Sequence, residues 1–402
     1  MQKGLKLAGI ALVIIIGVFA LLVIWQWDTV RFVLDNYDTL NEGSEWVAEL
    51  EEPEDLLDYI EAHPDKVALH AIRMNETDTE ISWRADEMQP VASVYKILIL
   101  AEVARQIEND TLDPDQMVPV DDVRSFYLPR TDGEAHQTAF QRFDDDGLIY
   151  NEQVALREVI RAMIRWSDNA ATDYLIHKVG RENLEELVER LDFEALEVPF
   201  PINGAYLLWE NHEMEDSPEE RFETYSGWER NQLIDEAYAA SKRMRDDDDF
   251  RRAEQERLEG SRLGLGLIMQ RNMAGITTPA GSAETYSRIM QSVFMNDFIS
   301  AEVSSRMQEY LEWPMTRDVI HQDFARFGTK SGSLPAVFTS ANYGRAHDED
   351  PVMVSMLFQD LHFGVWFHLM QQHLQQDFEI MLMKDPEFWD EVDQRLEGLQ
   401  TP

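Results

Sequence analysis

The chain of 402 residues contains no cysteine. A thiol nucleophile, a zinc site with thiolate ligands and a disulfide framework are therefore all excluded. Histidine is also scarce, with 10 residues and no H-x-x-x-H or H-E-x-x-H spacing. Since these spacings mark the common histidine metal sites, we predict no metal and no other cofactor.

Basic residues are few: 35 Lys and Arg stand against 77 Asp and Glu, for a formal net charge of −42. Such a chain repels nucleic-acid phosphates, so we exclude nucleic-acid binding. The acidic residues are spread along the whole sequence, which indicates a surface property and not an acidic tail. Adaptation to high salt explains this surface, and ordinary solubility is the alternative.

One long hydrophobic run occurs, Leu7 to Trp27, and it carries no charge. It is long enough to cross the inner (cytoplasmic) membrane once as a helix. Lys3 and Lys6 precede it and Asp28 follows, so we expect the N-terminus in the cytoplasm and the rest in the periplasm or outside the cell. A cleaved signal peptide is the alternative, but the run is longer than a usual h-region and no A-x-A-like site follows.

Beyond this anchor (residues 1–27) we expect a juxtamembrane linker (28–51) and one large domain (52–399). Strands are predicted near both ends of that domain and helices in between, which indicates an α+β fold with a discontinuous sheet. The predicted strands cover 67–74, 80–85, 327–334, 337–344 and 352–358, and the predicted helices include 52–63, 93–107 and 387–399. An acidic, helix-rich stretch at about 207–273 is interpreted as an insertion.

The insertion carries Trp209, Tyr225 and Trp228. These side chains either form a lid over a site or the buried face of an added helical layer, and we favour the buried face.

Three short motifs occur in order along the domain. Ser93 and Lys96 form S-x-x-K at the start of a predicted helix, which places both on one face, where a desolvated lysine can take the serine proton. Ser167-Asp168-Asn169 interrupts a helical region and supplies a second hydroxyl and an amide. Lys330-Ser331-Gly332 lies in a predicted strand, where glycine allows close backbone approach.

In this order and local structure, the motifs resemble those of the penicillin-binding proteins and beta-lactamases, and S-D-N resembles class A beta-lactamases in particular. The resemblance implies an antiparallel sheet flanked by helices, an all-helical subdomain and a site between them. It also implies a serine hydrolase acylated by beta-lactams or related acyl-D-Ala-type amides. By this resemblance, Ser93 is the nucleophile, Lys96 and Ser167 carry protons, and Asn169 positions the substrate. The backbone amides of Ser93 and Ser333 are the implied oxyanion donors. The implied substrate-binding residues are Lys330, Ser331 and Gly332.

One expected element is missing. Class A beta-lactamases carry an E-x-x-L-N glutamate that activates water, but alignment from Asn169 brings Ile202 or Asn203 to that position. Glu194 and Glu197 lie slightly upstream as substitutes, although exposed glutamates are ordinary. A D,D-peptidase or esterase therefore remains an alternative, as does a non-catalytic penicillin-binding sensor; the expected partner is a small-molecule or peptidoglycan-derived substrate.

Overall fold

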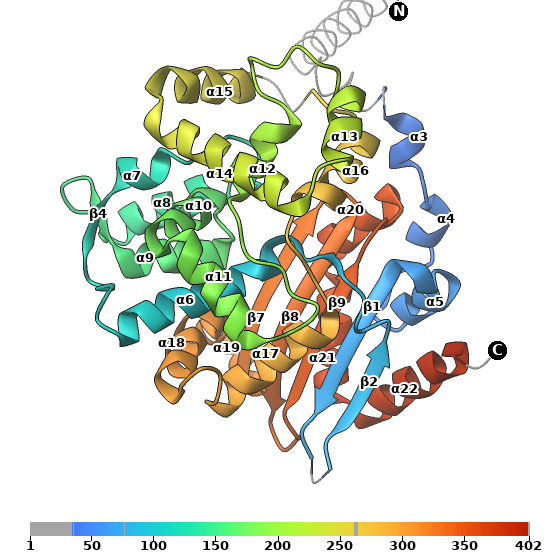
Figure 1. The fold of residues 1–402 in the computed structure, drawn as a ribbon. Coiled ribbons are helices and arrows are strands. Elements are labelled where there is room, and N and C mark those ends of the chain that lie inside the picture. The colour runs from blue at the N-terminus through green and yellow to red at the C-terminus, as the bar shows by residue number, and fades with distance from the viewer. Residues whose placement is uncertain (1–33, 35, 76, 261–263, 401–402) are drawn as a thin grey trace, which may run out of the picture.

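The centre of the computed structural model, which describes residues 34, 36–75, 77–260 and 264–400, is a five-stranded antiparallel sheet (Figure 1). Its strand order is β2-β1-β9-β8-β7. These strands are β1 (Val67–Arg73), β2 (Thr79–Trp83), β7 (Phe324–Leu334), β8 (Val337–Ala346) and β9 (Val352–Phe358). Since β1 pairs with β9, the two ends of the domain form one sheet, as the sequence predicts.

Burial along the strands follows the alternation of side chains across the sheet. In β1, Val67, Leu69 and Ala71 join the core on one face, while Ala68 and Ile72 join the core on the other. Both faces of this central strand are therefore covered, which explains its nearly continuous apolar sequence. The edge strand β2 shows the contrast, because only alternate residues are buried along it.

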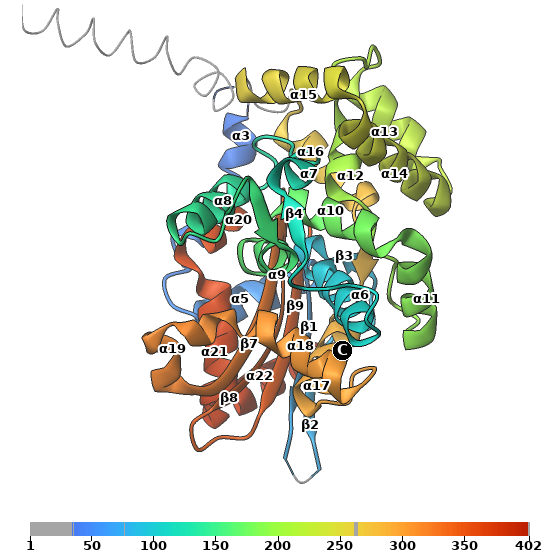
Figure 2. The ribbon, with the colours of Figure 1, turned by 90° about the vertical axis from the view of Figure 1, so that its left-hand side faces the viewer.

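Helices cover both faces of the sheet (Figure 2). On one face lie helices from both chain ends: α5 (Asp55–Ala62), α20 (Phe363–Gln372), α21 (Leu374–Lys384) and α22 (Pro386–Gln400). The opposite face is covered by α17 (Ala283–Met295) and α18 (Ala301–Leu311), and α6 (Lys96–Glu108) packs on α18. Shorter helices are α3 (Tyr37–Leu40), α4 (Ser44–Val47) and α19 (Asp318–Asp323).

The helical part of the domain stands beside the sheet and is formed by the middle of the sequence (Figure 1). Its helices are α7 (Val120–Arg124), α8 (Ala135–Asp145), α9 (Leu156–Arg161), α10 (Asn169–Val179), α11 (Arg181–Leu191), α12 (Ile202–Trp209), α13 (Pro218–Ser226), α14 (Arg230–Asp246), α15 (Asp248–Gly260) and α16 (Leu267–Thr277). Two short ribbons complete the described strands: β3 (Gln89–Pro90) with β6 (Ala280–Gly281), and β4 (Met117–Pro119) with β5 (Gln153–Ala155).

The stretch interpreted as an insertion contains α13, α14 and α15. Trp209 and Tyr225 are buried in it, as packing into a helical layer predicts, although Trp209 also reaches a cavity described below. Arg230 joins this layer to the rest of the domain by donating to the carbonyl oxygens of Ile276 and Thr278, both at 2.6 Å.

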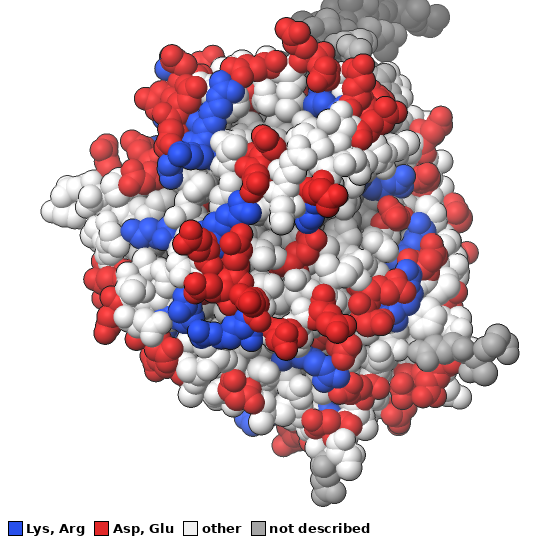
Figure 3. All heavy atoms as spheres, viewed as in Figure 1, with Lys and Arg blue, Asp and Glu red and all other residues white. Residues whose placement is uncertain are grey.

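Acidic side chains are distributed over the whole face seen in Figure 3, with lysines and arginines between them. Some of these charges pair, as where Arg395 binds Asp58 and Glu61, each at 2.6 Å. The distribution agrees with a property of the surface as a whole and not of one segment.

No helix within the described residues is long and apolar enough to cross a membrane. The span predicted at Leu7 to Trp27 lies outside these residues, and it remains a prediction.

Candidate active site

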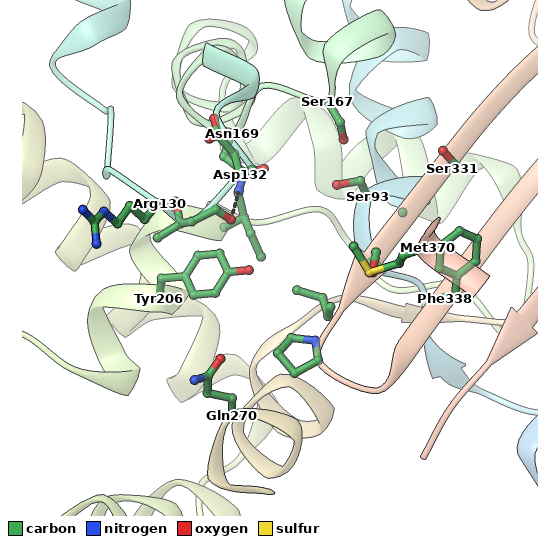
Figure 4. A pocket seen from close by; sticks show the side chains of 18 of the residues that line it. Ser93, Arg130, Asp132, Ser167, Asn169, Tyr206, Gln270, Ser331, Phe338 and Met370 are labelled. Carbon is green, nitrogen blue, oxygen red and sulfur yellow. Dashed lines mark hydrogen bonds between the residues drawn. The ribbon is translucent and has the colours of Figure 1, made fainter. Parts of the chain in front are cut away.

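Ser93 lies in a single 3-10 turn, Ala92–Tyr95, immediately before α6. It lines a cavity of about 380 Å³ between the helical part and the edge of β7 (Figure 4). Ala92, just before it, has a φ of 44°, in the left-handed region that residues with a Cβ rarely adopt. The backbone is thus constrained next to the predicted nucleophile, as often occurs at functional sites.

Lys96, at the first position of α6, is fully buried behind Ser93. Its Nζ donates to the carbonyl oxygen of Ser167 at 2.7 Å, to the Ser167 hydroxyl at 3.2 Å and to Asn169 Oδ1 at 2.8 Å. Burial lowers the pKa of Lys96 to about 8, although the charges of Asp168, Asp132 and Asp173 oppose the shift. About a tenth of this amine is therefore neutral at pH 7 and able to accept a proton.

Ser167 forms the corner between two helices that the sequence predicts. It follows one π-helical turn, Ala162–Trp166, and has a φ of 64°. Asp168 then caps α10 by accepting hydrogen bonds from the backbone amides of Ala170 at 2.8 Å and Ala171 at 3.1 Å. The corner turns the Ser167 hydroxyl and the Asn169 amide toward Lys96, while the Asp168 side chain stabilises the start of α10.

Lys330 approaches the same hydroxyl from the strand side. Its Nζ donates to Ser167 Oγ at 3.1 Å and to the carbonyl oxygen of Ser331 at 2.5 Å. Burial, and then the charge of Lys96, hold the pKa of Lys330 well below its ordinary value. The Ser167 hydroxyl therefore lies between two lysines, where it can pass a proton or receive one.

Gly332 brings β7 against the turn that carries Ser93. A Cβ placed at this position would lie 2.3 Å from the backbone nitrogen of Ser93 and 2.9 Å from Ala92 Cβ. Only glycine allows this approach without movement of one of the two elements. Thr339, on the next strand, donates its hydroxyl to the Val91 carbonyl at 2.8 Å and so holds the turn that carries Ser93.

Ser331 and Ser333 also line the cavity, on either side of Gly332. The Ser333 hydroxyl donates to the Val337 carbonyl at 3.3 Å and accepts from Trp366 Nε1 at 3.0 Å. These bonds fix the end of β7, from which the Ser333 backbone amide is predicted to act. The structure thus brings all eight predicted site residues to one place: Ser93, Lys96, Ser167, Asn169, Lys330, Ser331, Gly332 and Ser333.

A model described as the beta-lactamase enzyme family matches residues 53–374, most of the chain. The chain belongs to the beta-lactamase enzyme family. It is thereby a member of the larger superfamily of beta-lactamases and penicillin-binding proteins. No curated relative matches it.

A solved beta-lactamase shares the fold of this family member, and two others are similar to it. A double mutant of the chromosome-encoded beta-lactamase of Vibrio parahaemolyticus is 11% identical, covers 81% of this chain and 97% of its own, and has a TM-score of 0.50. The beta-lactamase of Sphaerobacter thermophilus is 14% identical, with 81% and 95% covered and a TM-score of 0.49. The class A beta-lactamase of Mycobacterium abscessus is 12% identical, with 82% and 98% covered and a TM-score of 0.48.

The two glutamates considered as water-activating bases do not lie at this beta-lactamase-like site. Glu194 is exposed and lines a different cavity, beside Arg288. Glu197 forms an ion pair with Arg230 and accepts a hydrogen bond from the Ala280 amide at 2.8 Å. Both were therefore wrong as candidates, because the loop that carries them is tied to β6 and to the helical layer instead of facing Ser93.

The positions reached by alignment from Asn169 supply no base either. Ile202 lines the cavity with an apolar side chain. Asn203 is buried, donates to the Phe126 carbonyl at 2.9 Å and accepts from the Thr131 hydroxyl at 3.2 Å. An amide held in this way stabilises the wall and cannot take a proton from water.

Sequence reasoning missed several residues of the cavity. Asp132 is the one carboxylate among its described lining residues, and burial, then the charge of Asp168, raises its pKa. Its carboxylate accepts from the His136 amide at 3.1 Å, near the start of α8. Large apolar and aromatic side chains form much of the remaining wall, and no motif marks them: Tyr206, Trp209, Phe338, Trp366 and Met370.

The histidines engage in other contacts. His136 Nδ1 lies 2.9 Å from Asp168, and His70 Nδ1 lies 2.5 Å from the Ser287 hydroxyl. No group of three or more His, Asp or Glu that could hold a metal ion occurs in the part of the chain that the structure describes.

Proposed function

We propose that this protein is a serine hydrolase that is acylated at Ser93 by beta-lactams or related acyl-D-Ala-type amides. The observation that carries the proposal is the contact set of Lys96. This buried amine, with a pKa lowered to about 8, bonds both Ser167 and Asn169 behind a serine at a helix start. Fully buried lysines are rare in proteins, and a catalytic site is a common reason for burying one among such partners.

In the proposed acylation, neutral Lys96 takes the proton of the Ser93 hydroxyl while the serine oxygen attacks the amide carbonyl. The backbone amides of Ser93 and Ser333 stabilise the resulting oxyanion. When the carbon–nitrogen bond breaks, the leaving nitrogen receives a proton from the Ser167 hydroxyl, which is replenished by one of its two lysine neighbours. Lys330 and Ser331 hold the substrate carboxylate on the strand side.

For release of the acyl group, the described residues of the site include no evident general base dedicated to activating water. Glu194 and Glu197 lie elsewhere, and none of the described residues that line the cavity is a glutamate that could activate water. This favours, as second candidates, a D,D-peptidase or esterase with slow turnover of beta-lactams, or a penicillin-binding sensor that stays acylated. Hydrolysis of the ester bond then depends on Lys96 or on water held by another group.

The test is to incubate the full-length protein in detergent with a fluorescent penicillin and a chromogenic cephalosporin. Labelling and turnover that vanish in Ser93→Ala support a beta-lactamase. Labelling without turnover supports the peptidase or the sensor, which cleavage of an acyl-D-Ala-D-Ala peptide separates. Ser125→Ala, at the C-terminal end of α7 and outside the cavity, is the matched control. Absence of Ser93-dependent labelling would refute the proposal.

We further propose that the helix predicted at Leu7 to Trp27 holds the protein in the cytoplasmic membrane with the catalytic domain outside the cytoplasm. Its uncharged sequence and the preceding Lys3 and Lys6 support this. There the domain meets a small-molecule or peptidoglycan-derived substrate. Release of the protein from membranes by alkaline carbonate alone would contradict it.

A further inference from the structure

Asp173 connects the S-D-N helix to the opposite wall of the cavity. It lies on α10, one turn after Asn169, and is fully buried. One carboxylate oxygen, Oδ1, accepts from the backbone amides of Ile202 at 2.8 Å and Asn203 at 3.4 Å, and Oδ2 accepts from the Gly204 amide at 3.3 Å. The carboxylate thus receives three consecutive N–H groups at the start of α12.

Helix α12 cannot satisfy those groups by itself. The first amides of a helix have no partner within it, and a side chain at the N-cap position usually accepts from one of them. Here that position is Pro201, which has no acceptor in its side chain, and all eight residues of α12 are buried away from water. Asp173 supplies the missing cap from a different helix, and its charge is favourable at that end of the helix dipole.

The helix that is capped in this way forms the wall facing β7. Ile202, Tyr206 and Trp209 all line the cavity, and the Tyr206 hydroxyl points into it (Figure 4). On its other side α12 packs directly on α14, because a Cβ on Gly204 would lie 2.0 Å from the carbonyl oxygen of Ala237. The cap at Asp173 therefore helps to decide where these three side chains meet a bound acyl group.

A second contact extends the arrangement into the helical layer. The Ser241 hydroxyl, on α14, donates to Asp173 Oδ2 at 3.1 Å, and it lies 3.0 Å from His177 Nε2. Burial lowers the pKa of His177 to about 4, so its ring is neutral at physiological pH. Because the serine proton is directed to Asp173, the neutral imidazole donates from Nε2 to Ser241.

We propose that Asp173 is a positioning residue for this site: its carboxyl group caps α12 and so holds Ile202, Tyr206 and Trp209 in the wall against which the acyl group binds. The contacts with the acyl group rest on the proposed function, whereas the capping does not.

The opening of α12 should depend on pH through the titration of Asp173. Burial raises the pKa of Asp173 to about 7, although Ser241 and the three backbone amides favour the charged form. Lys96 on α6 and the phenols of Tyr95 and Tyr238 are the titratable groups within its electrostatic reach. When α12 opens, Asp173 meets water and its pKa returns toward about 4. The closed form therefore binds the proton more tightly, so α12 opens more readily as the pH rises from about 4 to about 7.

Amide hydrogen exchange of the segment 202–209 in the full-length protein measures this opening directly. In the unmodified protein, protection corrected for intrinsic exchange should fall by up to about tenfold per pH unit between about pH 5 and about pH 6.5, and level off above about pH 7. Asp173→Asn is neutral at every pH and keeps an acceptor, so its protection should not vary with pH. Asp173→Ala has no acceptor and should lose about tenfold in protection at about pH 5.

Two further variants test whether the pH dependence of exchange comes from Asp173. Ser241→Ala removes a donor that favours the ionised carboxylate, so the pH at which protection levels off should move upward. Glu379→Gln is the matched control, because it changes another buried carboxyl group, on α21 at the far face of the sheet, and should leave the 202–209 profile unchanged. A profile in Asp173→Asn identical to that of the unmodified protein, or full protection in Asp173→Ala, would overturn the proposal.

Acylation gives the second measurement. Asp173→Ala should raise the penicillin concentration for half-maximal acylation by about tenfold while the limiting rate changes less, since the wall and not the nucleophile is displaced. Asp173→Asn should also shift the rise of the rate with pH to lower pH, because Lys96 loses a neighbouring negative charge. If penicillin does not label the unmodified protein, the proposed function fails while hydrogen exchange still decides the role of Asp173.

Discussion

Replacement of Gly332 by alanine gives a direct test of the close approach between β7 and Ser93, the proposed nucleophile. The added Cβ would lie 2.3 Å from the Ser93 nitrogen, about 1 Å short of the 3.4 Å at which ordinary contact begins. Since the neighbour is backbone and not a flexible side chain, the strand or the Ser93 turn must move by about that distance. A displacement of about 1 Å at a catalytic group costs on the order of 100-fold in rate.

The assay is the rate constant for labelling by a fluorescent penicillin at saturating concentration, measured with the free energy of unfolding in urea. Gly328→Ala is the matched control on the same strand, since its Cβ would also lie 2.3 Å from another atom, but from the side chain of Tyr343. We expect both variants to lose stability and only Gly332→Ala to lose about 100-fold in acylation rate. Labelling of Gly332→Ala at the rate of Gly328→Ala would show that this approach does not set the geometry of the site.

Three other predictions follow from charge. The rate of acylation should rise with pH with a midpoint at about 8, because Lys96 must be neutral to take the serine proton. Lys96→Met should remove this pH dependence along with most of the rate. A rate that does not depend on pH would contradict Lys96 as the base. Burial raises the pKa of Glu379 from 4.5 to about 8, so the free energy of unfolding should fall by up to roughly 5 kcal/mol as the pH rises from about 4.5 to about 8. In Glu379→Gln, the free energy of unfolding measured in urea should depend less on pH. The net charge of −42 predicts that the midpoint of thermal unfolding rises with added KCl, and indifference to salt would remove the case for a salt-adapted surface.

Local patterns in the sequence predict the sheet well. The strands expected at 337–344 and 352–358 correspond to β8 and β9, and those expected at 67–74 and 80–85 correspond to β1 and β2. These strands are rich in β-branched and aromatic residues bounded by turns, so their signal is contained in a few neighbouring residues. The three motifs are also local, and for this reason Ser93, Ser167 and Lys330 are found before their mutual contacts are known.

The parts that the sequence does not reveal depend on partners distant in the chain. Asp173 reads as an ordinary polar residue on a helix until α12 is seen to begin at its carboxylate. Glu197 reads as a free base in sequence, but its ion pair with Arg230 engages it elsewhere. Tyr206 reads as core, since its role at the cavity depends on which face α12 turns toward β7.

The pairing of β1 with β9 has a consequence for how the molecule is made. Residues such as Ala71 and Val354 are direct neighbours in the sheet, yet nearly three hundred positions of sequence separate them. A ribosome must therefore release almost the whole domain before β1 finds its partner, and until then the early hairpin has an open hydrogen-bonding edge. Chains that end before β9 should be captured by chaperones or degraded, so a truncated product should carry no partial activity.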